Sequence, residues 1–146
     1  MNNQTNKEIK KVVSSMHMGN YLFKSYIKRT KDEKLKAELQ NVLDRFISHV
    51  NKFKIVTNKY HVKNIDKFSF AQEVGINMQL MKQYKSDFAI VSDALKGLNM
   101  GMLGMLDFIY KNKNIDENVK DYAKVVLKDY DILTERLHKF SLETYC

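Results

Sequence analysis

Apolar side chains recur at alternating spacings of three and four residues along most of the chain, a pattern typical of helices that bury one narrow face. The spacing predicts long helices at residues 6–31, 33–60, 87–112 and 117–144. The pattern is least interrupted in the second helix, where the predicted buried face consists of Leu35, Leu39, Val42, Phe46, His49, Phe53, Val56 and Tyr60. Such helices pack side by side, so we expect an all-α bundle in one domain, residues 1–146.

The predicted helix boundaries rest on capping residues. Asp32 and Asp116 stand just before the second and fourth long helices, where a carboxylate can accept hydrogen bonds from free N–H groups of the first turn. Residues 61–68 interrupt the apolar spacing, and Ser69 is placed to cap a further segment at 69–86. The apolar residues of that segment in rough helical phase are Phe70, Ala71, Val74, Met78 and Met81. The sequence leaves open whether the segment is a separate helix or extends the third long helix.

The first two long helices resemble the last two in sequence. The Met-Gly pair ending at Gly19 recurs at Gly101, and Phe46 aligns with Tyr130, with the apolar positions of both helix pairs kept in phase. The two related hairpins are joined by residues 61–86, a connection long enough to run the length of the bundle. The repeat therefore predicts two antiparallel helix pairs linked by a long crossover.

Composition narrows the possible folds and sites. The chain has no proline and only five glycines, too few for the many turns of a β-sandwich or barrel. Its single cysteine, Cys146, excludes an intramolecular disulfide and a cysteine-rich metal site, and leaves open a disulfide between two chains. The polar start is unlike a secretory signal, and no apolar stretch approaches the ~18 residues of a membrane span, so we expect a soluble cytoplasmic protein.

The net charge of +8 is concentrated at the start of the chain, since residues 1–31 hold seven basic residues and one acid. The basic face of the first predicted helix consists of Lys7, Lys10, Lys11, Lys24, Lys28 and Arg29. Such a face can attract nucleic acid or another anionic surface. No base-reading motif or interleaved aromatic stripe accompanies it, so a solvated helix face is the simpler interpretation.

The paired Met-Gly elements and the stretch Gly97-Leu98-Asn99-Met100-Gly101, together with the crossover topology, resemble the ferritin-like superfamily. More narrowly, they resemble a group of uncharacterised ferritin-like proteins of spore-forming anaerobic bacteria, whose spore-coat relatives share the bundle. The resemblance implies an antiparallel four-helix bundle with a long crossover between the second and third long helices. In metal-binding members, four carboxylates and two histidines from these helices hold two metal ions.

This sequence lacks nearly all of those metal ligands. The internal repeat places the six ligand positions at or near Gly19, Phe46, His49, Gly101, Tyr130 and Leu133. Only His49 is a ligand type, and none of the six is the carboxylate that hard ions require in this geometry. We therefore expect a hydrophobic core plug at this layer, in which Phe46 and Tyr130 fill the space left by the two glycines.

Two further candidates for chemistry have simple structural interpretations. A core histidine such as His49 is usually neutral and hydrogen-bonded, here to the Tyr130 hydroxyl or to a backbone carbonyl. Glu135 and His138 form a Glu-x-x-His pair, but they flank the apolar face of the last helix. We expect that pair to lie off the bundle axis, in a surface or packing role.

The missing metal ligands on an otherwise complete scaffold favour a non-enzymatic structural or interaction protein without a cofactor. Self-association or binding of another protein, in a spore-related layer, would suit that role. One alternative is metal binding or storage, with Cu(I) or haem held by His49, Met16 and Met105, although methionine is also a common core filler. Another is binding of nucleic acid or an anionic surface through the basic first helix. The partner and the oligomeric state stay open.

Overall fold

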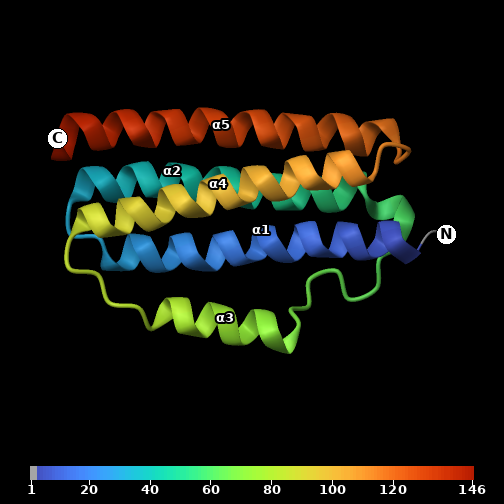
Figure 1. Ribbon diagram of the computed structural model, residues 1–146, viewed down its shortest axis with the longest axis horizontal. Helices are drawn as coiled ribbons and strands as arrows, with labels where there is room; N and C mark the ends of the chain where they lie inside the picture. The colour runs from blue at the N-terminus through green and yellow to red at the C-terminus, as the bar shows by residue number, and fades with distance from the viewer. Residues whose placement is uncertain (1–2) are drawn as a thin grey trace.

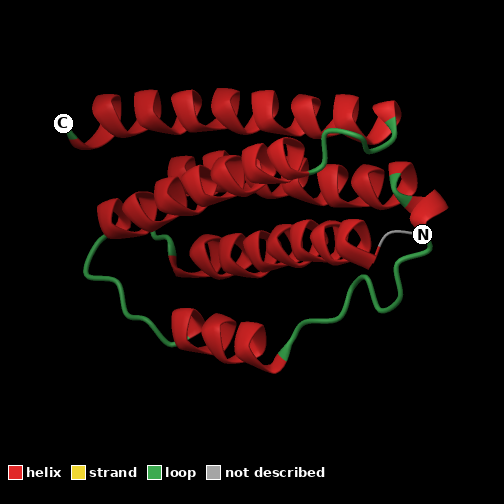
Figure 2. Cartoon of the chain, turned by 45° about the vertical axis from the view of Figure 1, so that its right-hand side comes forward, coloured by secondary structure: helices red, strands yellow, loops and turns green. Residues whose placement is uncertain are grey.

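The computed structural model describes residues 3–146, and the regular secondary structure of that range is helical throughout (Figure 1, Figure 2). The helices are α1 (Asn3–Arg29), α2 (Glu33–Val56), the short 3-10 helix η1 (Asn58–Tyr60), α3 (Phe70–Leu80), α4 (Asp87–Lys111) and α5 (Glu117–Tyr145). The predicted all-α fold is confirmed. None of these helices is long and apolar enough to cross a membrane.

Four long helices lie side by side, and α3 lies outside them (Figure 1). Helix α1 packs against α2 and α4, and α5 packs against the same two helices. Helices α1 and α2 run in opposite directions and are joined by a short turn, and α4 and α5 repeat this arrangement. Residues 57–86 connect the two pairs, running back along the outside of α1 and including α3. The apolar faces of the four long helices therefore meet in one interior.

The second long helix ends earlier than the periodicity predicts, at Val56 rather than near residue 60. The turn η1 follows it, and His61 then adopts a left-handed conformation with a φ of 49°, which ends the helical path. Tyr60 consequently leaves the buried face of α2. Its hydroxyl instead accepts a hydrogen bond from the backbone N–H of Asp116 at 3.0 Å, which ties the end of α2 to the start of α5.

The segment at 69–86 forms a separate short helix, α3, and does not extend α4. The Ser69 hydroxyl accepts a hydrogen bond from the Gln72 N–H at 3.2 Å, and the Gln72 side chain accepts one from the Ser69 N–H at 2.8 Å. Residues 81–86 are not helical, and Ser86 caps α4. The buried residue of α3 is Ile76, so the apolar residues that repeat in phase along this segment do not face the bundle.

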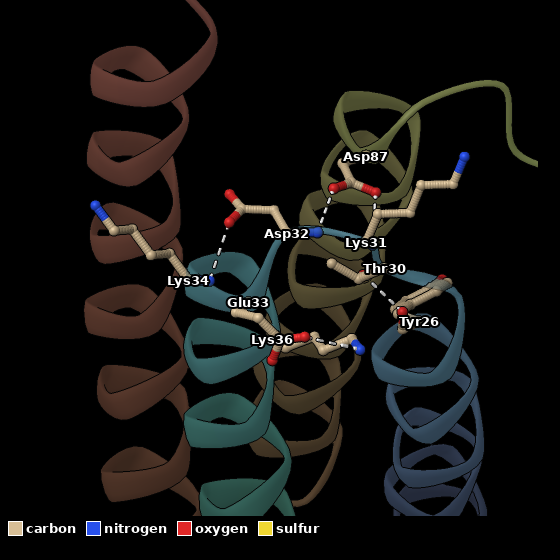
Figure 3. Close-up of polar contacts among 8 residues, drawn as sticks. All are labelled: Tyr26, Thr30, Lys31, Asp32, Glu33, Lys34, Lys36 and Asp87. Atoms are coloured by element: carbon tan, nitrogen blue, oxygen red, sulfur yellow. Dashed lines mark hydrogen bonds and ion pairs between the residues drawn. The ribbon is translucent and has the colours of Figure 1, made fainter.

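Polar contacts at one end of the bundle join the two helix pairs (Figure 3). Asp32 caps α2 as predicted, with Oδ1 accepting from the Lys34 N–H at 3.0 Å, and at the opposite end of the bundle Asp116 caps α5 in the same way. The Asp87 carboxylate, at the start of α4, accepts hydrogen bonds from the backbone N–H groups of Lys31 and Asp32 at 3.1 and 2.9 Å. The turn between α1 and α2 is thus fixed to the first turn of α4.

One continuous cluster of buried apolar side chains fills the space between the four long helices. The largest fully buried members are Phe23, Phe53, Phe108, Ile9, Leu35, Leu39, Ile90, Leu98 and Leu137. Truncating one such side chain to alanine typically costs about 2–5 kcal/mol. All four long helices contribute, so the interior holds both pairs together. The few buried polar residues include His49 of α2 and Asp129 of α5.

Candidate functional site

Two glycines and two aromatic rings meet at the centre of the bundle. A Cβ atom placed on Gly19 would lie 3.2 Å from Phe46 Cε2, and one placed on Gly101 would lie 3.1 Å from Tyr130 Cε2. The Phe46 and Tyr130 rings have centroids 5.1 Å apart, and Phe23 packs edge-on against Phe46 at 4.9 Å. Each ring therefore lies against the backbone of the neighbouring helix, so closely that a Cβ atom on either glycine would require the ring to shift.

The same contact occurs once in each helix pair. In the first pair it joins Gly19 of α1 to Phe46 of α2, and in the second it joins Gly101 of α4 to Tyr130 of α5. These are the positions that the internal repeat aligns in the sequence. The structure thus brings together all four residues of the expected core plug, which we call the glycine–aromatic layer.

Next to this layer, His49 lies in a buried polar cluster between α2 and α5. Its Nε2 lies 2.6 Å from Asp129 Oδ2, and its Nδ1 lies 2.7 Å from the Tyr122 hydroxyl oxygen. Arg45 donates to the same carboxylate, from Nε at 3.0 Å and from Nη2 at 2.5 Å. His49 and Asp129 are 7% and 6% exposed, so their contact is shielded from solvent, whereas the Arg45 side chain is 53% exposed.

The expected partners of His49 were wrong. The partners are Asp129 and Tyr122, whereas the Tyr130 ring contacts the His49 ring edge-on, with centroids 5.9 Å apart. Sequence reasoning missed these partners because they lie beside the narrow apolar face of α5. The sequence did contain one indication of these partners: Tyr122 and Asp129 are seven residues apart, and residues at that spacing lie on one side of a helix. Arg45 stands four residues before His49, which also places both on one side of α2.

The charges of the polar cluster follow from its hydrogen bonds. Burial alone would raise the pKa of Asp129, but hydrogen bonds from Arg45 and His49 outweigh it and hold that pKa below its usual value of 3.8. Burial and the charge of Asp129 raise the pKa of the Tyr122 phenol to about 12. At neutral pH the cluster therefore contains a carboxylate and a neutral phenol. Because a carboxylate can only accept, His49 Nε2 carries the proton in that contact.

These contacts limit what the cluster can do chemically. Both ring nitrogens of His49 are occupied by Asp129 and Tyr122, so neither is available to a metal ion without breaking a hydrogen bond. Within residues 3–146 no group of three or more His, Cys, Asp or Glu side chains is arranged to hold a metal ion. The cluster can position a proton and fix α2 against α5.

A cavity of about 170 Å³ lies between α1 and α4. Its lining includes four methionines, Met16, Met18, Met100 and Met105, and also all four residues of the glycine–aromatic layer. The cavity is mainly apolar and opens to the surface, because Lys11 and the exposed Met100 also line it. His49 does not line this cavity, so the three residues of the predicted metal alternative are not gathered at one point.

The predicted basic face is only partly a free surface. Lys7, Lys11, Lys24 and Lys28 are exposed, and Lys10 is partly so. Arg29 instead turns toward the crossover, where its guanidinium donates to the carbonyl oxygens of Leu80 and Lys82 and lies 5.2 Å from the centre of the Tyr84 ring. Arg29 therefore fixes the end of α3 to α1 and should be removed from the basic face.

Glu135 and His138, which form the Glu-x-x-His pair, are both exposed on α5, as expected. Cys146 is an exposed free thiol. The geometry around these residues assigns them no chemistry.

Comparison with known proteins supports the fold alone. No family model matches the chain, and no curated protein matches it. Among solved structures, it is similar to a conserved hypothetical protein, Rv2844, of Mycobacterium tuberculosis, with a TM-score of 0.75 and 11% sequence identity. The match covers 96% of this chain and 99% of the other. The two chains thus share their helical architecture over nearly their full lengths.

Proposed function

We propose that this protein is a non-enzymatic interaction protein on a ferritin-like four-helix scaffold whose di-metal site has been replaced by packed side chains. The observation that carries the proposal is the glycine–aromatic layer, in which Phe46 and Tyr130 occupy the space beside Gly19 and Gly101. The two antiparallel helix pairs and the long crossover support the scaffold assignment. A cytoplasmic location and a place in a spore-related layer are parts of the same proposal and rest on the sequence resemblance.

The electrostatics near this layer also support a role without a di-metal site. The acid beside the layer in sequence is Asp129, and both of its oxygens accept hydrogen bonds from Arg45 or His49. Releasing this carboxylate for a metal ion would leave an arginine and a histidine without their partner. Hard divalent ions need several carboxylate oxygens, and the layer itself offers aromatic rings and glycine.

Metal loading tests the proposal directly. We expect untagged protein, incubated anaerobically with excess Fe(II) or Mn(II) and then desalted, to retain well below one equivalent of metal per chain by elemental mass spectrometry. The His49→Ala variant should retain equally little, because no site depends on that residue. Two equivalents of either metal per chain in the wild type would overturn the proposal.

A second candidate function is Cu(I) binding, favoured by the four methionines that line one cavity. Thioethers are suitable ligands for Cu(I). If they hold it, replacing Met16 and Met105 by leucine, which conserves volume, should remove binding in a Cu(I) competition titration. His49→Ala should leave binding unchanged, because His49 lies outside the cavity. Equal binding by wild type and the double leucine variant would eliminate this candidate.

A further inference from the structure

Helix α3 exposes large apolar side chains on the side that faces away from the bundle. Phe70, Met78 and Met81 are 81%, 69% and 80% exposed, and Val74 is also exposed. Their spacings of four, four and three residues place them on one side of the helix, and we call these four residues the outer stripe. Ile76, which is buried, lies on the opposite side of α3. The helix is thus apolar on both sides, and among residues 3–146 only the inner side packs against the bundle.

The outer stripe is held in a defined orientation. The reciprocal hydrogen bonds of Ser69 and Gln72 fix the first turn of α3. At the other end, Arg29 of α1 donates to the carbonyl oxygens of Leu80 and Lys82. Just before α3, the Phe68 ring packs against Tyr21 of α1 with centroids 5.8 Å apart, and lies 6.3 Å from the His17 ring. Contacts at both ends therefore fix α3 to α1 with its apolar side outward.

Lysines flank this helix in the sequence, whereas the charged residue of α3 itself is the exposed Glu73. Lysines outnumber acidic residues five to two in residues 57–86. Among the residues that the structure describes, Lys63, Lys67 and Lys85 are exposed and have no ion-pair partner, whereas Lys59 and Lys82 pair with aspartates of the bundle. On α1, Lys24 and Lys28 follow Tyr21 at three and seven residues, which places them on the side of α1 that packs against the crossover.

We propose that α3 binds an anionic phospholipid surface, with the outer stripe inserted among the headgroups and the surrounding lysines paired with lipid phosphates. Exposed apolar side chains can insert at a membrane interface, and nearby lysines add attraction to anionic lipids; here the lysines come from the segments flanking α3 and from α1. The charge pattern favours this occupant over a second copy of the chain, because two copies meeting through α3 would bring like-charged surfaces together. The inference deepens the proposed interaction role by naming the partner.

Vesicle sedimentation tests the inference. We expect the wild type to bind vesicles of phosphatidylcholine and phosphatidylglycerol at least about tenfold more strongly than vesicles of phosphatidylcholine alone, and the difference to shrink in high salt. The triple variant Phe70→Ser, Met78→Ser and Met81→Ser should lose most of this binding. All three positions are exposed, so the variant should unfold at nearly the wild-type temperature.

The matched control carries three equivalent changes on α5, at Val125, Ile132 and Leu142, which are each more than half exposed. This control removes exposed apolar side chains without touching α3, and it should bind vesicles like the wild type. Equal loss of binding in both triple variants would overturn the inference, as would equal binding to the two vesicle types. A concentration-dependent increase in mass that only the α3 variant abolishes would assign the outer stripe to self-association instead.

A second readout uses the absence of tryptophan from the chain. Phe70→Trp introduces a single reporter into the outer stripe, and its emission should shift to the blue on addition of phosphatidylglycerol vesicles. Leu142→Trp on α5 should show no shift. A metal-loading result of either kind would leave these measurements unchanged, so failure of lipid binding and failure of the metal-free proposal can be told apart.

Discussion

Gly19→Glu is expected to lower the free energy of unfolding by about 3 kcal/mol, because the new side chain must displace a packed aromatic ring and place a charge in mainly apolar surroundings. A Cβ atom at this position would lie 3.2 Å from Phe46 Cε2, so the aromatic ring must move before any further atom is accommodated. The carboxylate would lie beside the Phe46 ring in the mainly apolar lining of the cavity between α1 and α4, where it loses part of its hydration. The displacement of the Phe46 ring and the lost hydration of the carboxylate therefore both lower the free energy of unfolding.

Gly104→Glu is the matched control for this change. A Cβ atom on Gly104, also a mid-helix glycine, would meet no atom within 4 Å, and the residue is exposed. Replacing an exposed helical glycine by a better helix former should be neutral or stabilising by about 0.5–1 kcal/mol. Urea unfolding followed by circular dichroism measures both variants. If Gly19→Glu were as stable as Gly104→Glu, the layer would be open to water and the packed interior would be refuted.

The four long helices could be predicted from the sequence because each buries a narrow face, and a buried face leaves a period in the chain. The capping aspartates Asp32 and Asp116 were predictable for a local reason, since a cap bonds to a backbone group two residues away. Gly19 and Phe46 were placed in one layer from the ligand pattern of the family that the chain resembles, with the internal repeat as the guide to position.

In the crossover, residues 57–86, the hydrophobic period did not predict which side chains are buried. Phe70, Met78 and Met81 recur in helical phase, as core residues do, yet they face solvent. A hydrophobic period shows that one side of a helix is apolar, but it does not show what covers that side. Burial is a property of tertiary packing, and here Ile76 on the opposite side makes the contact with the bundle. The end of α2 could not be predicted for a similar reason: the apolar spacing continues to Tyr60, but η1 and the left-handed conformation of His61 end the helix earlier.

The interior combines an apolar layer with a polar cluster directly beside it, and the two share a contact. Tyr130 packs against Phe46 on one side and against the His49 ring on the other. The orientation of the His49 ring is in turn fixed by Asp129 and Tyr122. A loss of the polar contacts should therefore loosen the aromatic packing as well. Replacing Asp129 consequently tests both kinds of contact between α2 and α5.

Asp129→Ala is expected to destabilise the fold by about 3 kcal/mol, because it leaves a buried histidine without its hydrogen-bond acceptor and Arg45 without its carboxylate. Asp129→Asn, which keeps an acceptor but removes the charge, should cost less. Asp131, two residues further along α5, is exposed and provides the control. Asp131→Ala should change the free energy of unfolding by no more than about 0.5 kcal/mol. Equal costs for the two alanine variants would contradict a stabilising role for the cluster.

The same carboxylate predicts how stability depends on pH. The pKa of Asp129 in the folded protein lies below its usual value of 3.8, so on acidification the unfolded chain takes up this proton first. The contribution of Asp129 is therefore complete above about pH 5, begins to fall near pH 4 and is lost as the pH drops through the folded-state pKa. Urea titrations of wild type and Asp129→Asn at pH 7 and pH 3 isolate this contribution from that of the other aspartates. The stability advantage of the wild type over the variant should shrink at pH 3, and an advantage that stayed constant or grew would show that Asp129 is not held as a carboxylate by Arg45 and His49.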